Sequence, residues 1–236
     1  MDGNGRWAER HGKSRIEGHR RGVENVRKIV DAARELGIPY ITLFAFSVEN
    51  WQRPKTEVSA LMTLLNTYLK KELQSLVKND VRLNVLGRVE ELPAKVRETL
   101  SQTIDKTKSH KSHVLSLALN YGARTELVDA VKTYAAQITS GRVDPGKLDW
   151  KTLSKYLYTR DIPDPDLIIR TSGEHRLSNF LLLQGAYAEI YFSPLCWPEF
   201  HPLHFIEAIN DFQQRERRYG QTGEQLKTAK KSLQRT

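Results

Sequence analysis

The sequence predicts an α/β fold, a single domain with a mainly parallel sheet flanked by helices. Short, nearly all-apolar runs, typical of strands covered on both faces, alternate with longer segments whose apolar residues recur every three or four positions. Such alternation is typical of parallel sheets whose crossover connections are helices. No linker, repeat or low-complexity block divides the 236 residues, a length that suits one large domain.

Each element of the first half of the chain rests on its own pattern. Apolar residues at helical spacing give the first two helices one buried stripe each, and Gly37 ends the first helix. Pro93 can open the third helix as its first residue, because an N–H there would lack a partner in any case. In order, we expect a helix over 20–36, a strand over 41–46, a polar loop over 47–56, a helix from residue 57, a strand over 81–86 and a helix from residue 93.

The second half of the chain continues the alternation. In order, we expect a strand over 114–119, a helix over 126–138, a loop with Gly141, Pro145 and Gly146, a short helix near 150–157, strands over 167–169 and 188–192, and a helix over 205–219. Ligands of such sheets bind outside the carboxyl ends of the strands. Functional residues are therefore expected after residues 46 and 169 and around Glu189.

The positive charge of the chain is concentrated at its two ends. The formal net charge is +9; residues 1–28 hold eight basic and four acidic side chains, and residues 215–236 hold seven and two. The stretch between them is neutral. An excess of positive charge suits nucleic acid, an anionic membrane surface or small polyanions, and equally a merely solvated surface.

Composition also excludes several classes of protein. No apolar run approaches the roughly 18 residues of a membrane span, and the start Met1 to Arg6 has no apolar segment of the signal-peptide type. Cys196 is the only cysteine, which excludes an internal disulfide and a zinc cluster built on thiolates. We therefore expect a cytoplasmic protein.

The first candidate site is the segment Asp2 to Trp7. Two glycines, a carboxylate, an amide and a guanidinium lie ahead of a helix, so that backbone N–H groups and the positive end of the helix can approach an anion. A diphosphate with Mg²⁺ suits this segment, with Asp2 as metal ligand and Arg6 on phosphate oxygens. A plain Gly-Asn-Gly turn is the alternative. Arg15 and His19 suit further phosphate contacts or the solvated face of the first helix.

The second candidate site is the segment Arg170 to Asn179, which follows an apolar strand. It presents two guanidiniums and hydroxyls beside a glycine, a combination that can grip a diphosphate. His175 on its own fits a structural or surface role better than a ligand role. Glu189 lies within an apolar strand, where a carboxylate needs a metal or an arginine as its partner.

The third candidate site is the polar loop 47–54. Asn50, Trp51 and Arg53 place an amide, an aromatic ring and a guanidinium in a loop long enough to act as a lid. An ordinary connection between a strand and a helix is the alternative.

Together these segments resemble the cis-prenyltransferases, most closely the bacterial undecaprenyl diphosphate synthases. Three separate motifs in the right order are far more specific than one, and the likeness runs to about residue 220. The matching stretches are Met1 to Ala8 for the first signature, 46–54 for the mobile loop and 166–181 for the diphosphate signature, with 187–189, 197–198 and 215–220. We therefore expect a catalytic domain over 1–220 and a basic, frayed tail over 221–236.

The resemblance implies partners, a cofactor and further features of the fold. It implies a homodimer, a parallel six-stranded sheet, an elongated hydrophobic tunnel for the growing chain, and Mg²⁺. The substrates would be isopentenyl diphosphate and an allylic diphosphate, expected to be farnesyl diphosphate. Repeated condensation would give undecaprenyl diphosphate, the lipid carrier precursor for cell-wall synthesis. The tail would then suit peripheral contact with a membrane.

The resemblance also assigns roles to residues of this sequence. Asp2 and Asn50 are the catalytic residues, and Glu189 and His175 would complete the metal site around Asp2, in one arrangement across the dimer interface. The allylic diphosphate would bind Gly3, Asn4, Gly5, Arg6, Trp7, Arg15 and His19; isopentenyl diphosphate would bind Arg170, Arg176 and Ser178; and Ser47, Glu49, Trp51 and Arg53 would close over both.

The chemistry of the implied reaction fits these residue types. Breaking the allylic C–O bond develops negative charge on the diphosphate, which cations stabilise more in the transition state than in the ground state. The double bond of isopentenyl diphosphate attacks the resulting allylic cation, and a proton then leaves. The family assigns proton acceptance to the position of Asn50, but a neutral amide is a poor base. We expect Asn50 to orient a water molecule or a diphosphate oxygen that takes the proton.

The sequence departs from the family pattern at its start. Members of the family carry an apolar strand before the Met-Asp-Gly-Asn signature, whereas this chain starts at Met1. We expect the absence of that strand to leave a buried sheet edge unpaired and Asp2 on a loose terminus.

Other functions stay open. A cis-prenyl synthase of another product length fits the same motifs. A nucleic-acid-binding protein would explain the charge and the basic tail, but aromatic and basic residues do not interleave on any one predicted strand or helix, so we expect no nucleic-acid partner. A catalytically silent partner subunit is disfavoured because the carboxylate and the arginines are all present.

Overall fold

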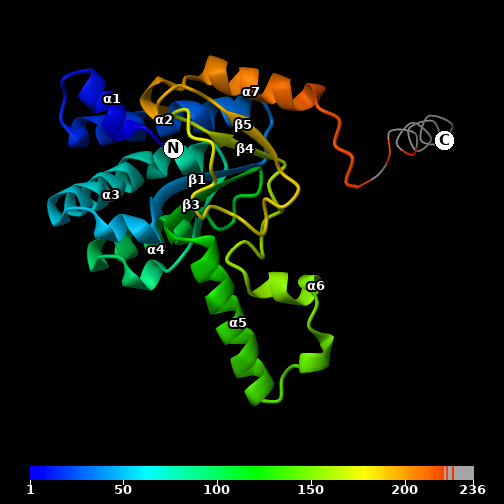
Figure 1. Ribbon diagram of the computed structural model, residues 1–236. Helices are drawn as coiled ribbons and strands as arrows, with labels where there is room; N and C mark the ends of the chain where they lie inside the picture. Colours follow the sequence, from blue (N-terminus) through cyan, green and yellow to red (C-terminus); the bar gives the residue numbers. More distant parts are fainter. Residues whose placement is uncertain (221, 223–224, 226–236) are drawn as a thin grey trace.

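The computed structural model describes residues 1–220, 222 and 225, so the predicted tail over 221–236 lies almost entirely outside the described residues. The predicted α/β class is confirmed, because every strand pair is parallel and helices flank the sheets (Figure 1). The strands are β1 (Tyr40–Ser47), β2 (Val81–Leu86), β3 (His113–Tyr121), β4 (Leu167–Arg170) and β5 (Glu189–Phe192). The α-helices are α1 (Asn4–Arg10), α2 (Arg15–Glu35), α3 (Lys55–Lys78), α4 (Ala94–Thr107), α5 (Ala123–Thr139), α6 (Trp150–Leu153) and α7 (Pro202–Gln214).

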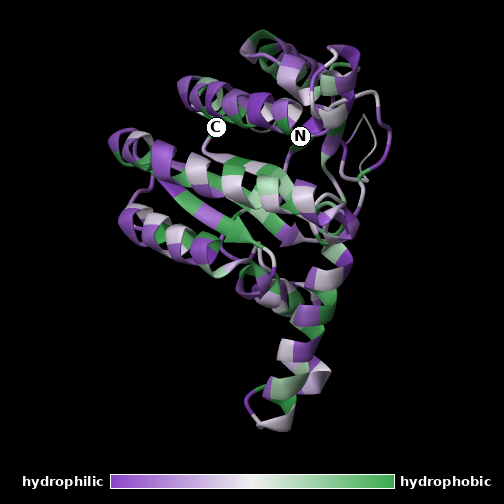
Figure 2. Ribbon diagram, turned by 90° about the vertical axis from the view of Figure 1, so that its left-hand side faces the viewer, coloured by the Kyte–Doolittle hydropathy of each residue, from purple (hydrophilic) through white to green (hydrophobic). Residues whose placement is uncertain are grey.

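The strands of the described residues form two sheets rather than the six-stranded sheet that the resemblance implied. One sheet has the order β1-β3-β2, and β4 pairs with β5 in the other. β3 is the central strand of the larger sheet, and all of its residues after His113 are buried, as its apolar run predicts. The strands are the most hydrophobic part of the molecule and lie between helices whose outer faces are polar (Figure 2).

β1 and β4 lie on either side of a groove. A cavity of about 460 Å³ separates them, lined by both strands and by Phe205 and Ile209 of α7. Among the described residues, β1 pairs only with β3 and β4 only with β5, so neither strand has a partner across the groove. The expected unpaired sheet edge therefore lies on both sides of this groove.

Helices cover the two sheets. α2 packs against α3 and α7, and α3 packs against α4 and β2. α5 and α6 extend away from this body as an arm (Figure 1). None of the helices in the described part of the chain is both long and apolar enough to cross a membrane.

Several helix boundaries differ from the sequence-based expectation. α2 begins at Arg15 rather than at residue 20, because the hydroxyl of Ser14 accepts a hydrogen bond from Glu17 N over 3.2 Å and caps the helix there. α1 is a separate helix that the sequence did not predict, since residues 2–7 were placed ahead of a helix, with a plain turn as the alternative. α7 starts at Pro202 rather than at residue 205, since proline suits a first helical position.

Candidate functional site

A polar cavity of about 720 Å³ opens where β1 and β4 end, and all three candidate segments line it. This is the edge of a parallel sheet at which ligands bind. The sequence-predicted residues that line it are Asp2, Gly3, Asn4, Gly5, Arg6, Arg15, His19, Ser47, Glu49, Asn50, Arg53, Arg170, Arg176 and Ser178.

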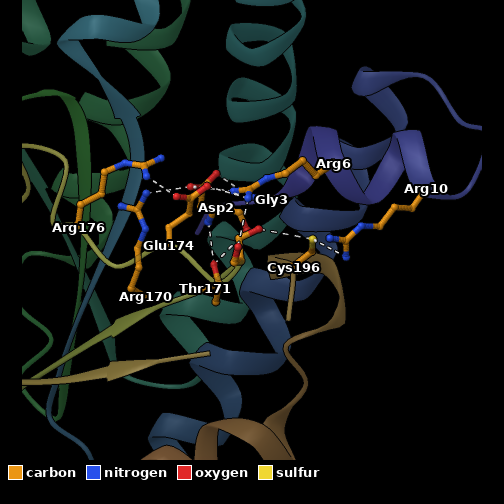
Figure 3. A network of polar contacts seen from close by, with 10 residues as sticks. Asp2, Gly3, Arg6, Arg10, Arg170, Thr171, Glu174, Arg176 and Cys196 are labelled. Carbon is orange, nitrogen blue, oxygen red and sulfur yellow. Dashed lines mark hydrogen bonds and ion pairs between the residues drawn. The ribbon is translucent and has the colours of Figure 1, made fainter. Parts of the chain in front are cut away.

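Asp2 lines this cavity and is held by a network of polar contacts (Figure 3). Its Oδ2 accepts a hydrogen bond from Arg170 Nη2 over 2.9 Å and lies 3.3 Å from Arg6 Nη2. Its main chain exchanges two hydrogen bonds with the Thr171 hydroxyl, at 2.9 and 3.0 Å, and its carbonyl accepts one from Trp197 N. The expectation of a loose Asp2 is therefore wrong.

The surroundings of Asp2 favour its charged form. Burial disfavours the carboxylate, but the N–H of Gly3, which donates to Oδ1 over 2.7 Å, and the guanidiniums of Arg170 and Arg6 outweigh that cost. Together they hold the pKa of Asp2 below its ordinary value. Asp2 is thus an ionised carboxylate at neutral pH, the form that a metal cation requires.

Gly3 allows the chain to pass close to the loop that follows β4. Its φ of +96° lies in the left-handed region, and a Cβ at this position would lie 2.2 Å from the Ser172 hydroxyl. Gly3 therefore allows the first candidate segment to contact the second.

The arginines of these two segments converge on a second carboxylate. Arg6 Nη1 lies 2.7 Å from Glu174 Oε1 and donates to the Ser172 carbonyl over 3.1 Å, while Arg176 also pairs with Glu174. Glu174 lies in the second segment, but its position in the sequence indicated no role for it. Together, the carboxylates of Glu174 and Asp2 balance the positive charge of the surrounding arginines (Figure 3).

Glu57 joins α2 to the third candidate segment, and its sequence pattern indicated only the start of a helix. Its carboxylate accepts hydrogen bonds from Arg15 Nε and Arg53 Nη1, both at 3.1 Å, and lies 3.2 Å from His19 Nε2. Arg53 has extended backbone ahead of α3, so the helical i,i+4 pattern gives no signal for its pair with Glu57. Burial lowers the pKa of His19 despite the hydrogen bond and the charge of Glu57.

The loop between β1 and α3 forms a 3₁₀ turn over Val48–Gln52 that is fastened at both ends. Trp51 Nε1 donates to Asn120 Oδ1 over 2.7 Å, and Asn179 Nδ2 donates to Glu49 Oε1 over 2.8 Å. Asn50 Oδ1 accepts a hydrogen bond from Ser47 N over 3.2 Å. In this structure the loop is therefore fixed against the ends of β3 and of the second segment.

Four sequence-predicted residues do not line the cavity, namely Trp7, Trp51, His175 and Glu189. Trp7 is buried in a small core with Ala8 and Cys196. The ring of His175 packs on Phe192, with 4.6 Å between the ring centroids. Glu189 pairs with Arg215 over 3.0 Å, so an arginine is the partner that its apolar strand requires.

The residues present fit Mg²⁺ through Asp2. No group of three histidine, cysteine or acidic side chains arranged for a metal occurs in the part of the chain that the structure describes. Mg²⁺ commonly binds through one or two carboxylates together with substrate phosphates and water, and the ionised Asp2 provides such a carboxylate in the cavity. Within the described residues, Glu189 pairs with Arg215 and His175 packs on Phe192, so neither is part of a metal site with Asp2.

An apolar cavity adjoins the polar one. It measures about 90 Å³ and lies between α2, α3 and the strands β1 and β3. Its walls include Val26, Met62 and Tyr68, and it shares Met1, Asn4, His19, Ala45 and Leu61 with the polar cavity. Apolar side chains therefore lie beside a charged site, an arrangement that suits a ligand with a charged head and an apolar chain.

Comparison with known proteins identifies relatives over nearly the whole chain. A family model described as "Putative undecaprenyl diphosphate synthase" matches residues 1–220. An isoprenyl transferase of Chlorobaculum tepidum is 51% identical over 97% of this chain and 86% of its own length. A Vibrio cholerae protein named ditrans,polycis-undecaprenyl-diphosphate synthase ((2E,6E)-farnesyl-diphosphate specific) is 46% identical over 96% of this chain and 91% of its own.

Solved structures resemble the fold as well. Lavandulyl diphosphate synthase from Lavandula x intermedia, in complex with dimethylallyl diphosphate, superposes with a TM-score of 0.92 and 33% sequence identity, over 94% of this chain and 95% of its own. A probable undecaprenyl diphosphate synthase from Campylobacter jejuni gives a TM-score of 0.75 at 37% identity, over 85% of this chain and 92% of its own.

Proposed function

The chain belongs to the cis-prenyltransferase family and is a prenyl-transferring enzyme, and we propose that it condenses isopentenyl diphosphate repeatedly onto farnesyl diphosphate to give undecaprenyl diphosphate. The observation that carries this proposal is the junction of the two cavities. Guanidiniums and Asp2 surround the polar cavity, while apolar side chains of α2 and α3 line the adjoining one. The name of the Vibrio cholerae relative supports farnesyl diphosphate as primer and the undecaprenyl product.

The two diphosphates would occupy different sides of the polar cavity. The allylic diphosphate would bind the first segment, with its chain directed into the apolar cavity past His19 and Leu61, two residues that both cavities share. Isopentenyl diphosphate would bind Arg170, Arg176 and Ser178. As the product grows, the apolar cavity would have to widen into an elongated tunnel between α2 and α3.

The residues of this chain would promote cleavage of the allylic C–O bond electrostatically. Arg6 and Arg15 would stabilise the negative charge that develops on the leaving diphosphate, because preformed cations in a partly buried site act more strongly there than in water. Asp2 would hold Mg²⁺, which when bound supplies further charge neutralisation at the same oxygens. Asn50 would orient the group that accepts the proton of isopentenyl diphosphate.

Assembly and location complete the proposal. We propose a homodimer, in which Glu189 and His175 would reach the metal site only from the partner subunit, since they do not line the cavity of their own. The chain over 1–220 would form the catalytic domain. The basic residues of 221–236 would attract an anionic membrane surface, where the lipid product is used.

Product analysis tests this function. The full chain is incubated with farnesyl diphosphate, radiolabelled isopentenyl diphosphate and Mg²⁺, and the extracted products are dephosphorylated and separated by chain length. The proposal predicts a product of undecaprenyl length that is lost when a chelator removes Mg²⁺. A single shorter or longer product would overturn the chain length and leave a different cis-prenyl synthase. No product from folded protein would overturn the activity.

A further inference from the structure

Arg124 is the one arginine lining the polar cavity that has no carboxylate within ion-pair distance among the described residues. It is the second residue of α5, and its side chain is exposed at the cavity wall. The other arginines of the cavity are compensated by Asp2, Glu57 or Glu174 at distances up to 3.3 Å; they are Arg6, Arg15, Arg53, Arg170 and Arg176.

Asn179 fixes the position of Arg124. Asn179 Oδ1 accepts a hydrogen bond from the backbone N–H of Arg124 over 3.0 Å, and its carbonyl accepts one from Ala123 N over 2.8 Å. A Cβ on Gly122 would lie 2.6 Å from Asn179 Nδ2, so the start of α5 sits tightly on this asparagine. Because Asn179 directly follows Ser178, α5 delivers Arg124 to the loop proposed to bind isopentenyl diphosphate.

The same asparagine connects Arg124 to the loop after β1. Asn179 Nδ2 donates to Glu49 Oε1 over 2.8 Å. Burial disfavours the charged form of Glu49, but this hydrogen bond and the positive charge of Arg124 are among the causes that hold the pKa of Glu49 below its ordinary value. Arg124 therefore lies close enough to act electrostatically on the mouth of the cavity.

We propose that Arg124 is a further substrate-binding residue, whose guanidinium contacts the diphosphate of isopentenyl diphosphate beside Arg176 and Ser178. This inference rests on the proposed function. The paired arginines can bind a diphosphate only while exchanging or sharing a carboxylate partner. Arg124 has no carboxylate partner among the described residues to exchange, and its planar guanidinium can donate two parallel hydrogen bonds to a phosphate.

The test compares Arg124→Gln and Arg124→Lys with the wild-type protein. Gln keeps the backbone bond to Asn179 but removes the charge, so we expect the KM for isopentenyl diphosphate to rise about tenfold, as for the loss of one charge-assisted hydrogen bond. The KM for farnesyl diphosphate should change less than twofold. Lys should recover part of the affinity, because it keeps the charge without the bidentate geometry. The affinity for inorganic diphosphate, measured by calorimetry, should also fall about tenfold in Arg124→Gln.

Lys132→Gln supplies the matched control. Lys132 is an exposed residue of the same helix that does not line the cavity, so its substitution changes the net charge equally and should leave both KM values unchanged. Equal effects of the two Gln variants would overturn the inference, as would an unchanged KM for isopentenyl diphosphate in Arg124→Gln. A wild-type protein that neither binds diphosphate nor forms product would overturn the proposed function itself, which distinguishes that failure from this one.

Discussion

Arg170 donates a hydrogen bond to the Asp2 carboxylate over 2.9 Å, although 168 positions of sequence separate the two residues. The contact joins the first candidate segment to the loop that follows β4. Only 15% of the Arg170 side chain is exposed, so Asp2 is also the principal compensation for a largely buried positive charge. A single carboxylate therefore supports the geometry of the site and provides the ligand proposed for Mg²⁺.

Replacing Asp2 should strongly lower turnover while the fold persists. Asp2→Asn preserves the shape of the side chain but removes the charge, so it should lower kcat by roughly 10²-fold or more, the scale of losing one electrostatic element of a catalytic site. Incorporation of labelled isopentenyl diphosphate measures the effect, and circular dichroism checks the fold. Asp161→Asn, at a carboxylate whose side chain is 75% exposed, is the control. Turnover within threefold of the wild type in Asp2→Asn would refute the role of Asp2.

Glu57→Gln should destabilise the protein. The Glu57 side chain is only 11% exposed and accepts hydrogen bonds from two arginines, so loss of its charge should lower the free energy of unfolding by roughly 2 kcal/mol, as for buried hydrogen bonds to charged groups. Urea unfolding measures the change. Glu24→Gln removes a carboxylate that is 40% exposed and also pairs with two arginines, and should have little effect. Equal losses in both variants would contradict the role given to Glu57.

Trp51→Phe should loosen the loop after β1 without removing its aromatic contact. Phe keeps a ring against Phe46 but leaves the buried Oδ1 of Asn120 without its donor, at a cost of about 1–3 kcal/mol in the free energy of unfolding. Thermal and urea unfolding measure this loss. Trp150→Phe, at an exposed tryptophan, serves as the control and should change neither the thermal nor the urea stability. A Trp51→Phe variant as stable as the wild type would show that the hydrogen bond does not fasten the loop.

Stability should fall as the pH drops below the ordinary histidine value of 6.5, in part through His19. Burial lowers the pKa of His19, so in acid the unfolded chain takes up a proton that the folded protein resists, and unfolding is favoured. Well above pH 6.5 the residue is neutral in both states and contributes no pH dependence. Urea unfolding at pH 7.5 and 5.5 should show a smaller decrease for His19→Gln than for the wild type. The exposed His175→Gln should retain the full decrease, and an unaltered decrease in His19→Gln would contradict this assignment.

The sequence predicted the fold class and the location of the site because both depend on local patterns. The apolar run of β3 predicts a buried strand, and the helical spacing of α2 predicts a helix, without any knowledge of what packs against them. The polar segments after β1 and β4 converge because carboxyl ends of parallel strands share one edge. The resemblance to the family predicted an unpaired sheet edge but not that it lies between β1 and β4, since strand pairing is a relationship between distant segments.

The details of the site depend on contacts that no local pattern specifies. Trp7 lies within the first signature, yet the turn of α1 directs its ring into the core beside Cys196. Glu57 and Asn179 carry no unusual signal in the sequence, and their importance arises from the arginines and loops that the fold brings to them. Glu189 was predicted to require a metal or an arginine, and its own chain supplies the arginine.

The most direct test of the account is the transfer of label from isopentenyl diphosphate into a lipid-extractable product in the presence of farnesyl diphosphate and Mg²⁺. We predict that the wild-type protein incorporates several labelled units per primer, that omission of farnesyl diphosphate prevents incorporation, and that the new double bonds are cis. Two results would contradict this function: incorporation of label that does not depend on the allylic primer, and no incorporation by protein whose cooperative unfolding shows that it is folded.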